Sequence, residues 1–287
     1  MNTIYYEENV FQPMIQAIME SGVDVKNDRT GTICRTLPHF VYQMEADGVT
    51  PFTDGKPSFP ISAVAEMIGY LRGYTDAQQF ADIGTRTWFV NANETQAWLE
   101  NKNRKGENDI GKAYGAIARD FGGIDLVKKV YNNLKAGVDD RGETITFWKP
   151  DDFDKACLRP CMRTHTFTLL GEHLFLFSES RSVDMFLGFN FNSIQALFLL
   201  KLMAKITGHK AGMVTHAMIN SHIYDKHFEQ VEEYLGRSIK NHKVSFEIAD
   251  WVTCLEDVID SDRHARDYIV IEGDYDPQEK IEAELVA

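Results

Sequence analysis

The chain has 287 residues, 44% of them hydrophobic, which is enough apolar sequence for one large core. Lysine and arginine total 30 against 43 aspartate and glutamate, so the formal net charge is −13. This balance argues against a surface that neutralises the phosphates of a nucleic-acid polymer, whereas a small anionic substrate needs only a few arginines.

Membrane insertion and disulfide crosslinking are also not expected. No segment approaches the roughly 18 consecutive apolar residues of a membrane span, and the N-terminus has no basic region followed by an apolar run. We therefore expect a cytoplasmic protein. Its four cysteines are too few for a disulfide framework and lack metal-ligand spacing, so we expect reduced thiols and no metal site. Without a repeat or linker, residues 1–287 are interpreted as a single domain.

Two helices are predicted in the first quarter of the chain. Residues 6–22 carry apolar side chains at helical spacing, and Gly22 can end that helix. The same spacing recurs over residues 62–73, where Gly73 marks the expected end. Both glycines stand where a helix commonly stops.

The middle of the chain predicts a β-hairpin followed by a buried helix. Residues 163–170 and 173–178 are rich in β-forming side chains and are separated by two residues, Gly171 and Glu172. Asn192 and Ser193 can cap a helix over residues 194–206, which is apolar on nearly every face. We expect an α+β fold in which helices pack on a mixed, mainly antiparallel sheet. The acidic last twenty or so residues are expected to be solvated, except at their end.

Cys161 is the first candidate for chemistry. It follows Arg159 and Pro160 just before a predicted strand, and nearby positive charge makes a thiol a better nucleophile. The alternative is a small core cysteine, which is the commoner case. Glu66 is a second candidate, because a carboxylate on an apolar helix face must be protonated, hydrogen-bonded or directed into a cavity.

Other polar clusters are weaker signals by themselves. The loop at 27–32 combines Arg29 with glycine and hydroxyl side chains, so it is either an anion-binding loop or an ordinary turn. The segment 180–184 offers arginine, hydroxyl and carboxylate groups within five residues. His222, in a segment of alternating polar side chains, would by itself be interpreted as structural.

Taken in order, these segments resemble thymidylate synthase and its relatives, the deoxycytidylate and deoxyuridylate hydroxymethylases. The shared motifs span most of the chain: NDRTGT at 27–32, EMIGYLRG at 66–73, DIGKAYG at 109–115, RPC at 159–161, RSVDMFLGFNFN at 181–192, SHIY at 221–224 and EGDYDP at 272–277. Several motifs in one order are far more specific than any single motif.

The resemblance implies covalent catalysis on deoxyuridylate (dUMP). Cys161 looks like the nucleophile that adds to C6 of the pyrimidine, after which C5 attacks the methylene of 5,10-methylenetetrahydrofolate. Glu66 is similar to the glutamate that orders water and moves protons, and Tyr114 is a candidate member of the same network. Asn192 aligns with the asparagine that pairs with O4 and N3–H of uracil, a role in which aspartate would favour cytosine.

The resemblance also assigns the groups that would hold the rest of both substrates. Arg181 and Ser182 resemble the phosphate-binding pair, with Arg29 a further ligand and Arg141 supplied across a homodimer interface. In addition, Arg181 is expected to favour the thiolate of Cys161. The remaining residues match sugar and folate contacts: His222 and Tyr224 for the deoxyribose hydroxyl, Asp184 for the pterin, Trp88 for the wall near the transferred carbon, and Ala287 for the tail that closes over folate.

Several positions depart from the pattern of thymidylate synthases. The differences are Met162 where histidine follows the nucleophile, Gly142 in place of a second arginine after Arg141, Asn220 for aspartate, Asn91 for a second tryptophan, and no lysine-arginine pair in residues 50–61. Methylation needs hydride transfer to the new carbon, whereas hydroxymethylation needs water to attack it. Because Asn91 and Met162 change the polarity of that pocket, the sequence narrowly favours a deoxyuridylate hydroxymethylase.

Two alternatives stay open. The first is a thymidylate synthase that converts dUMP to dTMP, favoured by the retained Trp88 and by the C-terminal ELVA. The second, more remote, is a catalytically inactive protein that binds nucleotide or regulates RNA. The inactive protein is disfavoured by four retained residues: Cys161, Glu66, Arg181 and Asn192.

Overall fold

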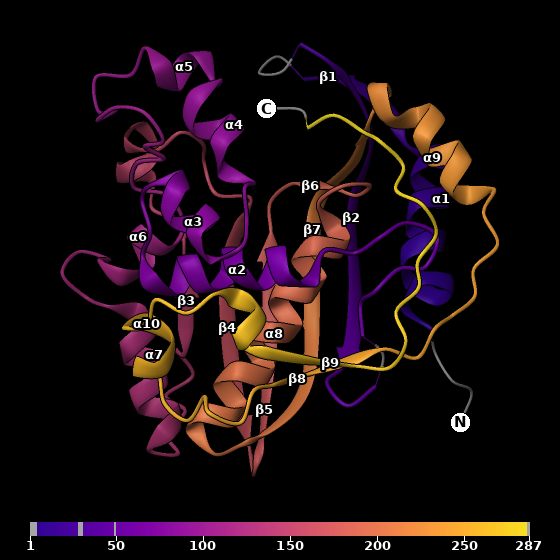
Figure 1. The fold of residues 1–287 in the computed structure, drawn as a ribbon. Coiled ribbons are helices and arrows are strands. Elements are labelled where there is room, and N and C mark those ends of the chain that lie inside the picture. Colours follow the sequence, from indigo (N-terminus) through magenta and orange to yellow (C-terminus); the bar gives the residue numbers. More distant parts are fainter. Residues whose placement is uncertain (1–4, 28–30, 49, 286–287) are drawn as a thin grey trace.

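A seven-stranded mixed sheet forms the framework of the protein, whose computed structural model describes residues 5–27, 31–48 and 50–285 (Figure 1). Its order is β1-β2-β7-β5-β4-β3, with β6 paired to β7. All pairings are antiparallel except β5 with β7 and β6 with β7. The strands are β1 Val23–Lys26, β2 Ile33–Glu45, β3 Thr144–Thr146, β4 Met162–Leu170, β5 His173–Ser180, β6 Val183–Asp184 and β7 Lys210–Tyr224. The predicted α+β fold with a mainly antiparallel sheet is confirmed.

Helices cover one face of this sheet, and a small second sheet closes the far side of the core (Figure 1). The α-helices are α1 Gln12–Ser21, α2 Pro60–Arg72, α3 Ala77–Ile83, α4 Trp88–Asn93, α5 Gln96–Leu99, α6 Gly115–Arg119, α7 Leu126–Lys135, α8 Phe189–Thr207, α9 Phe228–Leu235 and α10 Glu256–Ile259. A π-helical turn, η1 Glu7–Phe11, leads into α1, and three 3₁₀ turns are η2 Pro150–Lys155, η3 Asp225–His227 and η4 Ala265–Asp267. The second sheet pairs β8 Ser245–Ile248 with β9 Ile269–Glu272. In the described part of the chain, no helix is both long and apolar enough to cross a bilayer.

The predicted opening helix, the second helix and the hairpin are all present. Proline at the first position of α2 suits a helix start, and Gly73 ends α2 with a left-handed φ of 74°. Strands β4 and β5 pair across Gly171 and Glu172, as predicted. Cys161 therefore stands directly before a strand of the central sheet.

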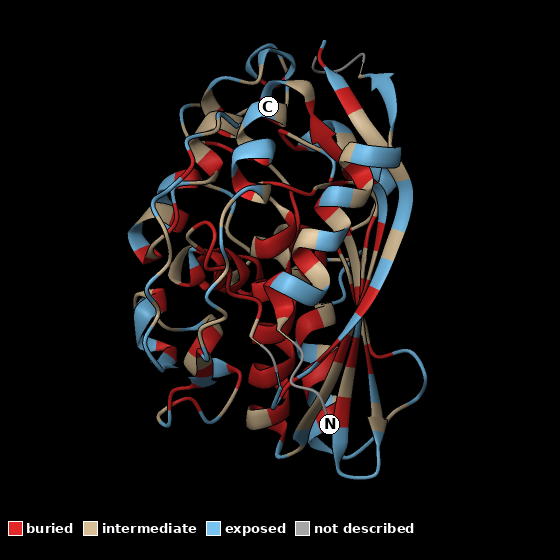
Figure 2. Cartoon of the chain, turned by 90° about the vertical axis from the view of Figure 1, so that its right-hand side faces the viewer, coloured by how far each residue is buried: buried red, intermediate tan, exposed pale blue. Residues whose placement is uncertain are grey.

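Helix α8 is the centre of the core, and almost all of its side chains are buried (Figure 2). It packs against β5 and β7 and also contacts α2, α7 and β8. The prediction that Asn192 and Ser193 cap this helix is wrong, because the helix begins at Phe189 with Gly188 as its N-cap. The Phe189 side chain is fully buried, which favours extending the helix by one more turn. Asn192 therefore lies inside the first turns of α8.

The acidic C-terminal tail is less solvated than predicted. The Tyr275 hydroxyl donates to the carbonyl of Thr53 at 2.8 Å and accepts the N–H of Ser58 at 2.6 Å. Further along, Ile281 is 6% exposed. The C-terminal segment, yellow in Figure 1, runs along the body of the protein. Its apolar side chains pack against the core.

Close contact between α2 and α6 gives a test of the packing. A Cβ on Gly115 would lie 1.9 Å from the carbonyl oxygen of Tyr70, which belongs to the backbone of α2 and cannot move alone. We expect Gly115→Ala to lower the free energy of unfolding by about 2 to 3 kcal/mol, the range for overpacked cores.

Urea unfolding followed by circular dichroism measures this loss. Gly236→Ala is the matched control, because an added Cβ there meets its nearest neighbours at 3.5 Å or more and the backbone is right-handed. Equal stability of the two variants would contradict the packing described.

Candidate active site

Cys161 lies where the chain leaves η2 and enters β4, and it is partly exposed. The Arg181 guanidinium Nη2 is 3.9 Å from the Cys161 sulfur. Two backbone carbonyls fix that guanidinium: Nε donates to Pro160 and Nη2 to Arg159, each at 2.9 Å. The backbone N–H of Arg181 also donates to the carbonyl of Cys161 at 2.8 Å. The structure therefore brings these two predicted site residues together.

An aromatic ring supports the Arg181 guanidinium from another side. The guanidinium carbon lies 5.6 Å from the centre of the Trp148 ring, and that of Arg163 lies 5.2 Å from the same ring. Arg163 is paired with Glu179 at 2.8 Å. The surroundings of Cys161 are thus rich in positive charge, although the protein as a whole is acidic.

Tyr114 connects Cys161 to the aromatic interior. Its hydroxyl oxygen accepts the backbone N–H of Cys161 at 2.8 Å, and its ring stacks on Tyr70 with centroids 4.6 Å apart. Burial, followed by negative charge at Cys161, raises the pKa of Tyr114 well above its usual value. Tyr114 therefore remains a neutral phenol whose own proton is available to a third group.

Glu66 lies on the buried face of α2, and each of its carboxylate oxygens has a partner. Thr87 donates its hydroxyl to Oε1 at 2.7 Å, and Gln195 donates its amide Nε2 to Oε2 at 2.8 Å. Burial raises the pKa of Glu66, while these two hydrogen bonds, with smaller contributions from Tyr70 and Trp88, partly oppose the rise. A carboxyl group in this position is suited to exchanging a proton.

Asn192 joins the same network through Gln195, one helical turn further along α8. Asn192 Nδ2 lies 3.4 Å from Gln195 Oε1, so the Gln195 amide bridges Glu66 and Asn192. Sequence analysis missed Gln195. The available signal was the one used for Glu66, a polar side chain within an otherwise apolar helix.

Four further predicted residues lie on the neighbouring strands. Ser182 links β5 to β6, and Asp184 of β6 is the register partner of His222 on β7. Asp184 Oδ1 accepts the N–H groups of Phe186 and Leu187 at 3.0 and 3.1 Å, which orients its carboxylate. The rings of His222 and Tyr224 meet edge to face at 5.0 Å.

The His222 ring has a defined tautomer. Nδ1 lies 2.8 Å from the carbonyl oxygen of Asn220, and because a carbonyl only accepts, Nδ1 carries the hydrogen. Nε2 is then an acceptor, and it is buried with no partner in the described part of the chain. This orphaned acceptor fits a hydroxyl group of a ligand.

Trp88 completes the aromatic side of the site. It begins α4, is 3% exposed, and meets Tyr114 edge to face at 5.7 Å and Tyr70 at 6.2 Å. The three rings form an apolar wall beside the polar network of Glu66.

Comparison with known proteins identifies the family, because the thymidylate synthase family model matches residues 9–287. The chain belongs to the thymidylate synthase family. Curated relatives include thymidylate synthases of Idiomarina loihiensis, 49% identical over 226 residues (77% of this chain and 80% of the relative), and Pseudoalteromonas translucida, 45% identical over 256 residues (84% and 90%). That of Aliivibrio fischeri is 43% identical over 252 residues (85% and 89%). The chain is thus a one-carbon transferase of this family, and the names of its relatives do not support the hydroxymethylase that sequence analysis preferred.

One predicted family residue, Arg141, does not join the Cys161 cluster in the described structure, and two others lie outside it. Arg141 is exposed in the loop between α7 and β3, with a left-handed φ of 65° and its backbone N–H bonded to Asp139 at 2.8 Å. Arg29 and Ala287 lie outside the described residues. Their assigned roles stay predictions from the family resemblance.

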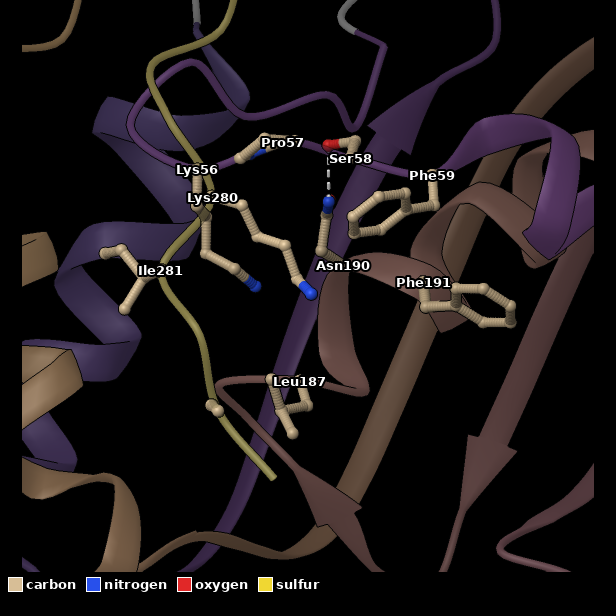
Figure 3. A pocket seen from close by; sticks show the side chains of 10 residues that line it. Lys56, Pro57, Ser58, Phe59, Leu187, Asn190, Phe191, Lys280 and Ile281 are labelled. Carbon is tan, nitrogen blue, oxygen red and sulfur yellow. Dashed lines mark hydrogen bonds between the residues drawn. The ribbon is translucent and has the colours of Figure 1, made fainter. Parts of the chain in front are cut away.

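A cavity lies between the loop before α2, the start of α8 and the C-terminal tail (Figure 3). The amines of Lys56 and Lys280 both point into it (Figure 3). Burial lowers the pKa of Lys56 to about 8, and its amine donates to the carbonyl of Phe186 at 2.6 Å. Asn190 Oδ1, which lines the same cavity, is buried without a partner among the described residues.

The cysteines give a direct test of the site's accessibility. Burial raises the pKa of Cys157 to about 12, whereas Cys161 is partly exposed. We expect iodoacetamide at neutral pH to alkylate Cys161 and to leave Cys157 unmodified in the folded protein. Peptide mapping by mass spectrometry after a time course measures both rates, with urea-unfolded protein as the control. Equal labelling of both residues in the folded state would contradict the described burial.

Proposed function

We propose that this protein is a thymidylate synthase, which methylates dUMP to dTMP with 5,10-methylenetetrahydrofolate as the source of carbon and hydride. The observation that carries the proposal is the contact between the Cys161 sulfur and the Arg181 guanidinium, at 3.9 Å. This contact lies beside a network that offers a proton-exchanging carboxyl and an amide. A nucleophile, an anion-binding group and an acid-base group are the three functions that the reaction requires.

Cys161 acts as the nucleophile toward C6 of the pyrimidine. The new S–C6 bond moves the C5–C6 electron pair toward C5, which then attacks the methylene carbon of the folate as one of that carbon's two C–N bonds breaks and the nitrogen takes the electron pair. Loss of the C5 proton, cleavage of the second C–N bond and hydride transfer from the folate then give the methyl group, and the S–C6 bond breaks to release Cys161. A cation beside sulfur stabilises the thiolate, which is the reactive form. Arg181 serves this purpose and, with Ser182, also binds the phosphate of the nucleotide in fork geometry. Arg29 is assigned as a further phosphate ligand on the family resemblance.

Asn192, Glu66 and Tyr114 act on the base. The Asn192 amide donates to O4 and accepts from N3–H of uracil. Glu66 and Tyr114 hold and move protons at O4 and C5, for which a carboxyl pKa raised by burial is suited. His222 Nε2, the buried orphan acceptor, receives the 3′-hydroxyl of deoxyribose together with Tyr224.

Folate lies against the apolar wall and extends toward the cavity lined by Lys56 and Lys280. The wall of Trp88, Tyr70 and Tyr114 excludes water from the transferred carbon, which favours hydride transfer over hydration. Met162, 2% exposed, adds an apolar side chain where histidine would hold water. Asp184 contacts the pterin and Ala287 the closing tail, as the resemblance implies. The Lys56 and Lys280 amines fit the carboxylate-bearing end of folate.

A homodimer completes the proposal. The outer face of the sheet exposes apolar side chains on neighbouring strands: Val41 at 56%, Phe177 at 44% and Ile219 at 38%. The registers Val41↔Ala217 and Phe177↔Thr215 put all three on one face. A second copy of the chain covers this face and contributes Arg141 to the phosphate site.

Turnover with a defined product tests the function. The protein is mixed with dUMP and methylenetetrahydrofolate, dihydrofolate is followed by absorbance, and the nucleotide is weighed by mass spectrometry. We expect dihydrofolate and a nucleotide heavier by one methyl group. Cys161→Ser should lower kcat by at least about a thousandfold, since it removes the nucleophile. Cys254→Ser, a cysteine outside the site, is the matched control.

Two outcomes would overturn the proposal. A hydroxymethyl nucleotide formed without dihydrofolate would show that water attacks the new carbon, as in the hydroxymethylases. Binding of dUMP without any turnover would indicate an inactive nucleotide-binding protein.

A further inference from the structure

Gln195 contacts both groups that act on the pyrimidine base. It is fully buried in α8, with Nε2 2.8 Å from Glu66 Oε2 and Oε1 3.4 Å from Asn192 Nδ2. Family resemblance gives Gln195 no role. The residue carries one donor end and one acceptor end, and each end faces a different member of the site.

The charge of Glu66 determines how this amide is oriented. An ionised carboxylate only accepts hydrogen bonds, so Gln195 must present Nε2 to Glu66. Gln195 Oε1 then faces Asn192, and because this oxygen only accepts, Asn192 donates to it through Nδ2. This leaves Asn192 Oδ1 as an acceptor for the ligand, together with the second hydrogen of Nδ2. One acceptor beside one donor is the pattern that pairs with N3–H and O4 of uracil.

Protonated Glu66 favours the opposite orientation. A carboxylic acid donates its O–H, so the Gln195 amide turns to accept that hydrogen on Oε1 and presents Nε2 to Asn192. Asn192 Oδ1 is then occupied by Gln195 and no longer accepts N3–H of uracil. Cytosine, which has no N3–H and offers an amino donor instead of O4, is disfavoured less by this change.

We propose that Gln195 is a specificity-determining positioning residue, which passes the ionisation state of Glu66 to the orientation of the Asn192 amide. The inference rests on the proposed function, since it assumes that the Asn192 amide recognises the pyrimidine base by hydrogen bonding. Gln195 itself touches neither base nor folate in this scheme. It acts through its two neighbours.

We call the link from Glu66 through Gln195 to Asn192 the relay. The other groups around Glu66 allow the relay to be separated from a simple change in the pKa of Glu66. Tyr70 and Tyr114 are the titratable groups that face Glu66, with Cys161 and Arg181 beyond Tyr114. Thr87 donates to the other carboxylate oxygen. Among the described hydrogen bonds, the only further partner of its hydroxyl is the Thr85 hydroxyl, at 3.1 Å. Thr87 therefore stabilises charged Glu66 as Gln195 does, but without a connection to Asn192.

The test compares Gln195→Met with Thr87→Val, using kcat/KM for dUMP and dCMP across a range of pH. Each change removes a hydrogen bond that favours charged Glu66, so the pKa of Glu66 rises and the acid limb of the pH profile moves to higher pH in both variants. At pH well above the acid limb, where Glu66 is charged in both variants, only Gln195→Met should also lower the preference for dUMP over dCMP, by about tenfold, the effect of losing one buried hydrogen bond. In Thr87→Val, the fall in preference should move to higher pH together with the acid limb. An unchanged preference in Gln195→Met would overturn the proposal.

Two further measurements test the relay even if Gln195→Met does not fold, one on the wild-type protein and one on a conservative variant. In wild type, the ratio of dUMP to dCMP affinity should fall as pH is lowered across the acid limb; a constant ratio would overturn the relay. Gln195→Glu should keep the preference when its carboxyl group is protonated, because its O–H then donates to the Glu66 carboxylate and its other oxygen accepts from Asn192 Nδ2. A loss as large as that of Gln195→Met would also count against the relay. Wild type that does not methylate dUMP would refute the proposed function instead, so the two failures are distinguishable.

Discussion

The contact between the Cys161 sulfur and the Arg181 guanidinium is the interaction on which the site depends. It exists because β4 and β5 are consecutive antiparallel strands, so the residue before one strand meets the residue after the other. The carbonyls of Arg159 and Pro160 and the face of Trp148 then fix a side chain that is otherwise flexible. A charge held in advance costs little reorganisation when negative charge develops on sulfur or arrives as phosphate.

The apolar interior gives the remaining polar groups their properties. Glu66 is surrounded by aromatic rings and by α8, so burial raises its pKa and every hydrogen bond to it becomes consequential. The same interior lowers the pKa of His165 to about 3 and that of His216 to about 4, which keeps both neutral beneath the sheet. The buried carboxylate of Glu66 is compensated by hydrogen bonds from Thr87 and Gln195.

The sequence predicts elements with a strong periodic pattern and misses details that depend on tertiary contacts. The α2 helix, the β4–β5 hairpin and the burial of α8 follow from spacing and turn residues. The start of α8 does not, because the burial of Phe189 extends the helix past two good capping residues. The acidic tail likewise lies against the protein because of Tyr275 and Ile281, two apolar anchors in a charged segment.

The candidate site shows the same division. Cys161, Arg181, Glu66 and Tyr114 were predicted through motifs, and the structure brings them together. Gln195 and Thr87 were missed, because their hydrogen bonds to Glu66 span 129 and 21 positions of the sequence. A polar side chain in an apolar helix points to Gln195 as a candidate but does not show which partner it meets. The preference for hydroxymethylation rests on two single differences, Asn91 and Met162. Their effect on water in the pocket depends on the surrounding wall of aromatic rings as well as on the two residues themselves.

Covalent capture at Cys161 is the most direct test of the account. The protein is incubated with 5-fluoro-dUMP and methylenetetrahydrofolate, and its intact mass is measured after denaturation. In 5-fluoro-dUMP, fluorine replaces the C5 proton that must leave during turnover, so the reaction stops at the covalent adduct. The account predicts a stable ternary adduct that maps to the peptide containing Cys161. An unmodified mass under conditions that saturate nucleotide binding, or an adduct on another residue, would contradict it.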